Sequence, residues 1–195
     1  MAFSAASRAG RSTLRAAAEA LSIASATLFG IAAAGATSGC ATFGLDGNTY
    51  HGDGYSFRLP TAPSTWELID VSDAALAYRD VESAGTILVN GRCDKDGDDV
   101  PLSSLTQHLF MRFTERDVTR EETVPFDGRE ALHTVMTAKL DGVPKTFSAW
   151  VLKKDGCVFD LVYVADPGRF SAGASRFDGY ATQLRVLPRE GDEGP

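Results

Sequence analysis

Between residues 55 and 92 the chain alternates apolar and polar side chains over short runs, a pattern typical of β-strands. These runs predict strands at Tyr55–Leu59, Trp66–Val71, Ala75–Arg79 and Thr86–Arg92. The last run carries apolar side chains on both of its faces. It therefore favours a central strand that is covered on both sides.

Four longer β-type runs follow in the second half of the chain. They lie at Val118–Pro125, Arg129–Leu140, Pro144–Lys153 and Cys157–Ala165. An Asp-Gly pair separates each run from the next, at positions 127–128, 141–142 and 155–156. Asp-Gly favours two-residue hairpin turns because both central positions adopt positive φ. The four runs therefore predict an antiparallel meander.

Two segments instead repeat apolar residues at helical spacing. The first lies between the two groups of strands and begins after Pro101, with apolar positions Leu102, Leu105, Leu109, Phe110 and Phe113. The second closes the domain, with apolar positions Phe170, Ala174, Phe177, Ala181 and Leu184. The predicted fold class is α+β, a mostly antiparallel sheet with helices packed on it.

The N-terminal segment has the three parts of a secretory signal. Its basic residues Arg8, Arg11 and Arg15 precede a long neutral stretch that ends in small residues. Thr37-Ser-Gly-Cys40 resembles a bacterial lipobox, which predicts that residues 1–39 are a signal peptide and that Cys40 is lipidated. Two alternatives stay open: cleavage at Ala34-Gly-Ala36, which would release a soluble protein, and an uncleaved membrane anchor.

The remaining chain divides into three parts. Residues 40–54 are rich in Gly, Thr and Asp and predict a flexible tether, residues 55–187 form a single α+β domain, and residues 188–195 form a disordered acidic tail. The predicted leader holds three of the 19 basic and one of the 26 acidic residues, so the mature chain has a net charge of −9. Such an acidic domain is a poor nucleic-acid binder.

The cysteine count fits an oxidising compartment. If Cys40 carries lipid, Cys93 and Cys157 remain as a pair, each at the end of a predicted strand. We expect a Cys93–Cys157 disulfide. Two unrelated buried thiols are the alternative, and a redox-active pair is disfavoured because the sequence has no C-x-x-C.

Several short motifs follow one another in a familiar order. The sequence resembles a group of envelope lipoproteins of delta-type proteobacteria, whose plan is similar to the PsbP-like fold. The resemblance covers residues 54–186 and implies an α-β-α sandwich. It implies no catalytic residue, because PsbP-like domains are typically accessory or binding modules, and fold alone does not give function. The motifs are Gly54-Tyr-Ser-Phe-Arg-Leu-Pro60, Trp66, Tyr78-Arg-Asp80, Asp127-Gly-Arg-Glu-Ala131, Leu140-Asp-Gly-Val-Pro144, Lys153-Lys-Asp-Gly-Cys157 and Asp160-Leu-Val-Tyr163.

Two sets of candidate metal ligands fail on spacing. The loop Asp94–Asp99 begins like an EF-hand, but the positions that require Gly and Glu hold Asp99 and Leu105. No spacing joins the histidines to each other or to cysteines; they are His51, His108 and His133. We therefore expect no metal site and no cofactor.

The remaining candidates for chemistry are weak. Gly173-Ala-Ser175 lacks the second glycine of a nucleophile elbow, although a triad assembled only by the fold stays open. Two charged pairs beside hairpin turns, Arg129-Glu130 and Lys153-Lys154, are solvated turn residues or a partner-binding edge. Trp66 and Trp150 are expected to pack in the core rather than to line a pocket.

Together these features predict an exported, lipid-anchored, non-catalytic accessory or binding module. It would lie on the periplasmic side of an envelope membrane, with the outer membrane favoured, and act through a protein partner of the envelope. A carrier of a small hydrophobic ligand or lipid is one alternative, and it requires a cavity of roughly a few hundred Å³. An enzyme with an unrecognised site is the other, and it requires a cleft with converging titratable groups.

Overall fold

A computed structural model of the chain describes residues 44–93 and 100–188. The predicted leader, Cys40, the acidic loop Asp94–Asp99 and the predicted tail beyond Pro188 lie outside the described residues. The described residues of the unit Cys40–Pro195 form a compact domain with its own hydrophobic core.

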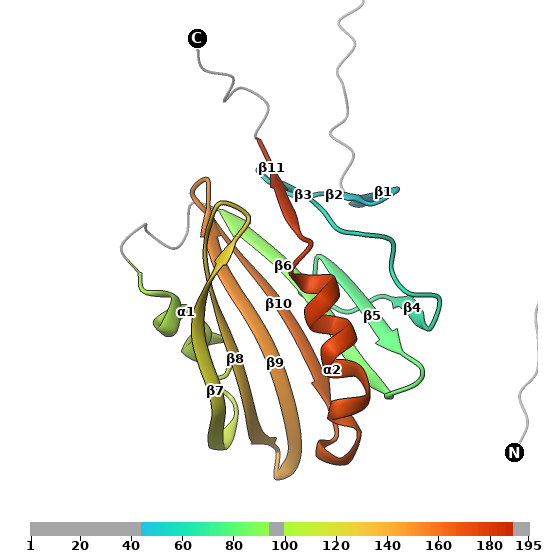
Figure 1. Cartoon of the computed structure of the whole chain (residues 1–195), viewed down its shortest axis with the longest axis vertical. Helices are drawn as coiled ribbons and strands as arrows, with labels where there is room; N and C mark the ends of the chain where they lie inside the picture. Colours follow the sequence, from blue (N-terminus) through green and yellow to red (C-terminus); the bar gives the residue numbers. More distant parts are fainter. Residues whose placement is uncertain (1–43, 94–99, 189–195) are drawn as a thin grey trace, which may run out of the picture. The chain divides into compact units, whose positions relative to one another are not determined.

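The main element is a seven-stranded antiparallel sheet with the order β4-β5-β6-β10-β9-β8-β7 (Figure 1). Every predicted strand is present, with ends shifted by a few residues. The predicted central strand is β6, which lies between β5 and β10 and buries Ile87 and Val89. The strands are β4 (Trp66–Ile69), β5 (Leu76–Asp80), β6 (Gly85–Cys93), β7 (Thr114–Phe126), β8 (Arg129–Leu140), β9 (Val143–Lys154) and β10 (Cys157–Ala165).

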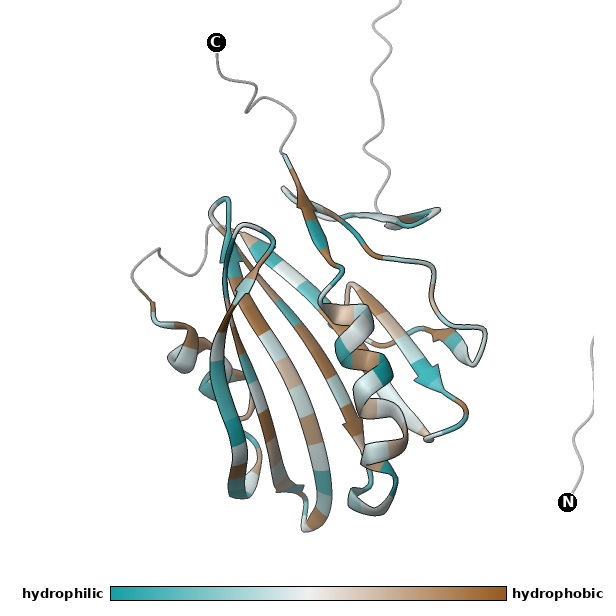
Figure 2. Cartoon of the chain, in the orientation of Figure 1, coloured by the Kyte–Doolittle hydropathy of each residue, from teal (hydrophilic) through white to brown (hydrophobic). Residues whose placement is uncertain are grey.

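Two-residue turns join the four long strands β7 to β10, as predicted. Both residues of each Asp-Gly pair have positive φ, for example 47° at Asp127 and 76° at Gly128. This conformation matches the twist of the flanking strands and sets the register of the hairpins. The edge strand β7 is exposed and mostly hydrophilic along its length, whereas β9 and β10 are rich in apolar residues (Figure 2). Charged residues on an edge discourage pairing with other chains.

The two helices pack on opposite faces of this sheet. Helix α1 (Leu102–Leu109) contacts Val151 and Val158 through Leu105. Helix α2 (Pro167–Ala181) packs Phe177 and Tyr180 against residues of the other face, such as Phe159 and Leu161. Trp150 of β9 and Leu161 of β10 are paired in register, and both lie on the α2 face. Val151, the next residue along β9, lies on the α1 face.

A second, four-stranded sheet lies beside α2, and the sequence did not predict it. Its order is β1-β2-β3-β11, and all pairs are antiparallel. The strands are β1 (Gly44–Asp46), β2 (Thr49–His51), β3 (Ser56–Arg58) and β11 (Arg185–Leu187). Phe57 and Val186 of this sheet join the same core as α2. The domain is therefore dominated by sheets, and the predicted α-β-α sandwich holds only roughly.

The N-terminal part of this sheet corrects the predicted flexible tether at residues 40–54. Residues 44–51 instead form the β1–β2 hairpin. Local propensity is low here, because each strand has only three residues and glycines surround them. The hairpin is held by tertiary contacts: β2 pairs with β3, and the ring of Tyr50 stacks on Phe57 with centroids 5.2 Å apart. The described part of the domain thus begins at Gly44 rather than at residue 55.

The predicted disulfide is present. Cys93 and Cys157 are directly opposite each other at the paired ends of β6 and β10, and their sulfur atoms are bonded. The bond closes a loop of 64 residues that includes α1 and the strands β7, β8 and β9. A cross-link of this span limits the unfolded chain and typically stabilises a domain by about 2–4 kcal/mol.

Candidate functional site

An apolar groove lies between the N-terminal sheet and the strands β4 and β5. It consists of two neighbouring pockets, an inner lobe of about 190 Å³ and an outer lobe of about 380 Å³, which share the lining residues Leu45 and Leu76. We call these two lobes together the apolar groove. The inner lobe is lined by Leu45, Gly47, Asn48, Phe57, Leu59, Pro60, Thr61, Ala62, Leu76, Tyr78 and Tyr180. The outer lobe is lined by Gly44, Leu45, Tyr50, Leu68, Ile69, Asp70, Val71, Ala74, Ala75, Leu76 and Ala77.

Aromatic rings form one wall of the inner lobe. Tyr180 of α2 lies edge-on to Trp66 of β4, with ring centroids 4.8 Å apart, and Tyr78 of β5 lies 5.8 Å from Trp66. Strand alternation explains this arrangement, because Trp66 and Tyr78 point from their strands towards the face covered by α2. Both tryptophans lie in the core cluster, as predicted, and Trp66 stands behind the groove wall.

Tyr180 has a buried hydroxyl. The residue is only 4% exposed, and its hydroxyl lies beside Tyr78 with almost no exposed surface. Burial, followed by the neighbouring Tyr78, raises the pKa of this phenol, so it stays protonated. Tyr180 therefore belongs, together with Tyr78, to the aromatic wall, and its hydroxyl is not presented to either lobe.

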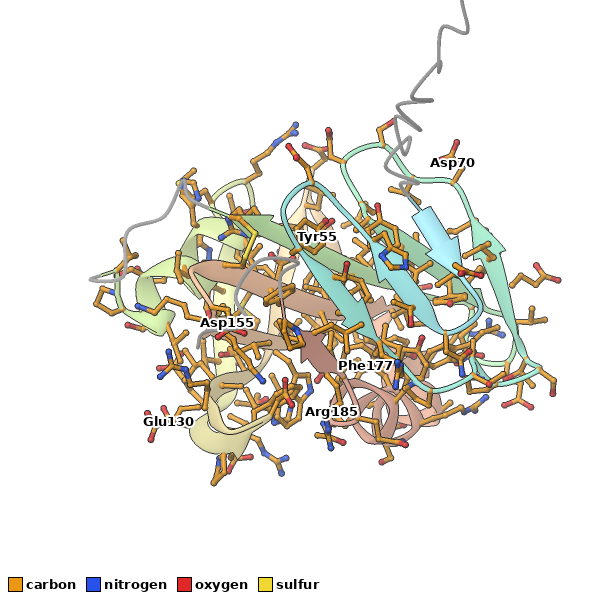
Figure 3. The ribbon with its side chains drawn as sticks, turned by 90° about the horizontal axis from the view of Figure 1, so that it is seen from above. Tyr55, Asp70, Glu130, Asp155, Phe177 and Arg185 are labelled. Atoms are coloured by element: carbon orange, nitrogen blue, oxygen red, sulfur yellow. A yellow bond between two sulfur atoms is a disulfide. The ribbon has the colours of Figure 1, made fainter. Side chains whose placement is uncertain are left out.

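The outer lobe is open and carries negative charge at its rim. Leu68 is 61% exposed and Leu45 is 43% exposed, so both present apolar surface. Asp70 is the one charged residue in the lining of either lobe. Asp46 and Asp73 flank the lining, and these three aspartates form no ion pair within residues 44–93 and 100–188. Figure 3 labels Asp70 on this side of the domain.

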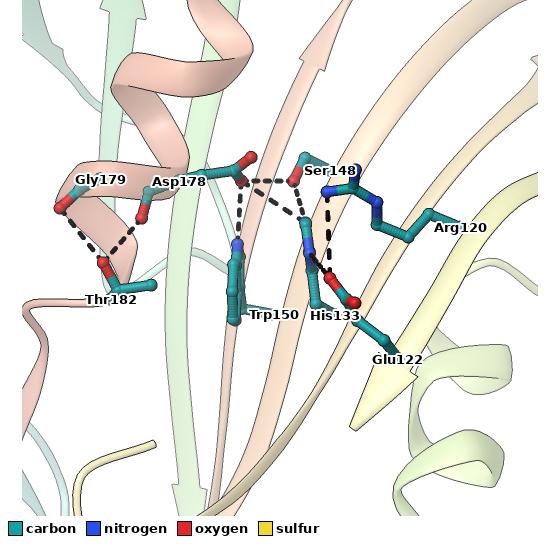
Figure 4. A network of polar contacts seen from close by, with 8 residues as sticks. All are labelled: Arg120, Glu122, His133, Ser148, Trp150, Asp178, Gly179 and Thr182. Carbon is teal, nitrogen blue, oxygen red and sulfur yellow. Dashed lines mark hydrogen bonds and ion pairs between the residues drawn. The ribbon is translucent and has the colours of Figure 1, made fainter. Parts of the chain in front are cut away.

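A second cluster brings together a serine, a histidine and two carboxylates, which the sequence left open as a triad formed only by the fold (Figure 4). His133 Nε2 lies 2.9 Å from Ser148 Oγ, and His133 Nδ1 lies 3.5 Å from Glu122 Oε1. The residues come from β8, β9 and β7. We call them, with Trp150 and Asp178, the polar network.

Asp178 of α2 determines which group donates each hydrogen bond in the polar network. Ser148 donates its hydroxyl to Asp178 Oδ1 over 2.7 Å, and Trp150 Nε1 donates to the same oxygen over 3.0 Å. Because Ser148 has given its only proton to Asp178, His133 Nε2 must donate to Ser148 rather than accept from it. A catalytic serine requires the opposite arrangement, in which histidine accepts the hydroxyl proton.

The serine and the histidine of the polar network are buried, whereas Glu122 and Asp178 are partly exposed. Ser148 has no exposed surface, and the His133 ring stacks on Trp150 with centroids 4.0 Å apart. Burial tends to raise the pKa of Asp178, but the hydrogen bonds from His133, Trp150 and Ser148 outweigh it and hold that pKa below its usual range. The charged Asp178 therefore ties α2 to the sheet, and no residue of the cluster lines either lobe of the apolar groove.

A third feature joins the two charged pairs that the sequence singled out. Arg129-Glu130 and Lys153-Lys154 line one open cleft of about 430 Å³ at the turn end of β8–β10, together with Leu102, Asp155, Gly156, Cys157 and Val158. Lys154 is held by Asp127 over 2.8 Å, and Lys153 donates to the carbonyl of Val100. Figure 3 labels Glu130 and Asp155 here, away from Asp70. A partner-binding role for this polar cleft stays a prediction.

The other residues that the sequence singled out lie in different parts of the chain or outside the described residues. Cys40 and the acidic loop lie outside the described residues. His51 bonds to Ser56, His108 is an exposed residue of α1, and His133 is buried in the polar network. Within the described ranges, no three His, Cys, Asp or Glu side chains lie close enough together to hold a metal ion. None of the helices described there is long and apolar enough to cross a bilayer.

Sequence reasoning missed the apolar groove and the polar network. One local signal for the groove was present, because Asp46-Gly47 is another Asp-Gly pair, and Gly47 has a φ of 57° in the β1–β2 turn. No local signal marked Ser148 or Asp178, since 30 residues separate them in the chain.

Comparison with solved structures identifies the fold. The chain is similar to cyanobacterial PsbP (CyanoP) from Synechocystis sp. PCC 6803, with a TM-score of 0.53 and 17% identity over 71% of this chain and 91% of that one. It is also similar to LpqN, described as involved in cell envelope biogenesis of Mycobacterium tuberculosis, with a TM-score of 0.51 and 17% identity over 71% and 88%. No protein-family model and no curated protein sequence matches the chain.

These matches confirm the PsbP-like fold and no more than the fold, because the identities are low. Membership in the delta-proteobacterial lipoprotein group stays a prediction from the sequence motifs.

Proposed function

We propose that the protein is an exported, non-catalytic binding module that a lipid on Cys40 holds at the periplasmic side of an envelope membrane. The observation that carries the proposal is the apolar groove. It is open, and almost all of the described residues that line it are uncharged. These are features of a ligand site.

The position of the groove fits the proposed anchor. Gly44 lines the outer lobe, and only four residue steps separate it from Cys40. A fully extended chain spans at most about 3.6 Å per residue, so Cys40 lies within about 14 Å of Gly44. A lipid on Cys40 would therefore keep the groove close to the membrane surface, with the outer membrane as the favoured location.

Two further observations support an envelope address. The Cys93–Cys157 disulfide is stable in an oxidising compartment and is rare in the cytosol. LpqN, one of the proteins with a similar fold, is described as acting in cell envelope biogenesis. For this chain we propose a protein partner of the envelope as a second binder, at the polar cleft formed by Arg129, Glu130 and Lys153.

The test of the proposal is the chemical state of Cys40. Intact-mass measurement of the protein from a membrane fraction should show a diacyl or triacyl modification at a mature N-terminus formed by Cys40. Cys40→Ser should move the protein to the soluble periplasmic fraction. Reduction should then add the mass of two hydrogens, from Cys93 and Cys157 alone. An unmodified Cys40, with the wild-type protein in the soluble fraction, would overturn the anchor.

A further inference from the structure

His133 lies at the centre of the polar network, and both of its ring nitrogens face an acceptor. Nε2 lies 2.9 Å from Ser148 Oγ and 3.6 Å from Asp178 Oδ1, and Nδ1 lies 3.5 Å from Glu122 Oε1 (Figure 4). The flat side of the ring stacks on Trp150. These partners come from β9, α2 and β7, so the protonation of this one buried ring affects three elements.

Asp178 keeps a hydrogen on Nε2. Burial tends to raise the pKa of Asp178, but the hydrogen bonds from His133, Trp150 and Ser148 hold that pKa below its usual range. Asp178 is therefore a carboxylate throughout the range in which histidine side chains change charge, and it accepts the Ser148 hydroxyl hydrogen over that whole range. Ser148 can then only accept from Nε2, whether the ring is charged or neutral.

The second proton of a charged ring lies on Nδ1, opposite Glu122. A carboxylate only accepts hydrogen bonds, so this contact is favourable while Nδ1 carries a hydrogen and unfavourable once its lone pair faces the carboxylate oxygen. Glu122 is directly opposite His133 in the β7–β8 register. Arg120 lies 3.9 Å from Glu122, so the ion pairs of the described chain place Glu122, Arg120 and Asp178 around the ring.

Strand β7 depends on β8 for its place in the fold, because it is the edge strand of the main sheet and is exposed along almost its whole length. Its pairing with β8 has register shifts between Thr114 and Asp117 and between Val118 and Arg120. Glu122 lies just after the second shift, where regular pairing begins. A charge-dependent contact at this point therefore affects how firmly β7 is held.

We propose that His133 is a pH-sensitive switch for the edge strand β7. With both nitrogens protonated, the ring is a cation that pairs with Glu122 and holds β7 to the rest of the sheet. Loss of the Nδ1 proton, in the range of about pH 5 to 8 in which histidine changes charge, removes this pair and loosens β7. The hydrogen bonds from Ser148 and Trp150 to Asp178 do not use that proton, so α2 stays attached. The switch is independent of the proposed anchor and of the apolar groove.

Nitrogen-15 NMR of the His133 ring tests the assignment of the two protons. The protein is exported, so that the Cys93–Cys157 disulfide forms, and the exposed His108 serves as the reference. Both ring nitrogens of His133 should carry hydrogen at about pH 5, and at about pH 8 only Nε2 should keep it. A neutral ring with its hydrogen on Nδ1, or a ring that does not change between the two pH values, would overturn the proposal.

Amide hydrogen exchange tests the effect on β7. After correction for the intrinsic effect of pH on exchange, the β7 amides that pair with β8 should open about 2- to 5-fold more often at pH 8 than at pH 5. The expected change is modest because half of the Glu122 side chain is exposed. Amides of α2 and β10 should change less. An equal change throughout the domain, or no change at β7, would contradict the switch.

Glu122→Gln and Glu121→Gln form a matched pair of variants. The two residues are neighbours on β7, both are exposed, and their side chains point to opposite faces, so only Glu122 pairs with His133. Glu122→Gln should abolish the pH dependence of exchange at β7, whereas Glu121→Gln should retain the full change of about 2- to 5-fold. The same pH dependence in both variants would show that the Glu122–His133 pair is not its source.

Discussion

The polar network and the apolar groove flank the same helix and differ in their polar atoms. In the polar network, Asp178 receives hydrogen bonds from Ser148 and Trp150, and His133 completes the set. At the groove, Tyr180 lies on the same helix only two residues after Asp178, yet it packs among the rings of Trp66 and Tyr78. The first region joins polar groups into one hydrogen-bonded network, and the described lining of the second is almost wholly uncharged.

This difference shows why residue types alone mislead. A serine, a histidine and a carboxylate within hydrogen-bond distance suggest hydrolysis, but the direction of the Ser148 proton and the complete burial of Ser148 point to a structural role. The described lining of the groove contains no such triad of residue types. It suggests function through its open apolar surface.

The largest effect is expected from the polar network. Trp150→Ala should lower the free energy of unfolding by about 3–5 kcal/mol, because it removes a buried ring, its stacking on His133 and a donor to Asp178. Urea denaturation measures the change, with Val143→Ala at an exposed position as the control. A loss below about 1 kcal/mol would mean that the network does not hold α2 to the sheet.

A pH dependence separates two carboxylates, the partly buried Asp178 and the buried Asp160. The pKa of Asp178 is lowered in the fold, so its contribution to stability is present above its unfolded pKa of about 3.9 and is lost as the pH falls through the folded value. Asp178→Asn should therefore cost about 2 kcal/mol at pH 7 and much less at pH 3. Urea midpoints at the two pH values measure this, and an equal cost at both would contradict it.

Asp160 provides the contrast, because burial raises its pKa despite the bonds from Asn90 and Arg92. The folded state then binds the proton more tightly than the unfolded state, so this residue's contribution falls as the pH rises through the unfolded and then the folded pKa. Asp160→Asn should make stability less sensitive to pH on the alkaline side of the unfolded value. A steeper dependence in this variant would reverse the assigned sign.

Ser148 tests the two interpretations of the triad directly. A fluorophosphonate reagent should not label the folded protein at Ser148, since the hydroxyl is buried and already donates to Asp178. Ser148→Ala should cost about 1–2 kcal/mol, because one donor to a partly buried carboxylate is lost. Stoichiometric labelling at Ser148, detected by peptide mass, would instead favour the hydrolase.

The smallest effect on stability is expected at the groove. Leu68→Ser should change the free energy of unfolding by less than about 0.5 kcal/mol, because the side chain is largely exposed. The same variant should weaken binding of the uncharged dye N-phenyl-1-naphthylamine at the groove, which separates binding from stability at this site. A stability loss comparable to that of Trp150→Ala would show that Leu68 is a core residue and would blur the contrast between the two regions.

Local sequence signals accounted for most of the main sheet. Asp127-Gly128 and its two equivalents specify hairpins because few residue pairs accept positive φ at both positions, and β8 and β10 have the bounds that the pattern predicts. Helix spacing placed α1 and α2 to within a few residues. The Cys93–Cys157 pair followed from the count of cysteines and from their places at strand ends.

Close packing between distant segments was beyond such signals. Gly173 illustrates this, because a Cβ atom there would lie 2.4 Å from the hydroxyl of Tyr163. The apolar pattern of the helix does not predict this close contact. The sequence pattern also gives no signal for the strands β1, β2 and β11, since three-residue strands form only when a partner strand is already in place.

The sequence by itself determined the features that act over a few residues: the hairpin turns, the amphipathic helices and the acidic charge. Tertiary structure alone decided which polar atoms meet. Register put His133 and Ser148 on one face, and α2 then brought Asp178 to them. The physical reason is that a hydrogen bond depends on positions in space, and these positions exist only once sheet and helix have packed together.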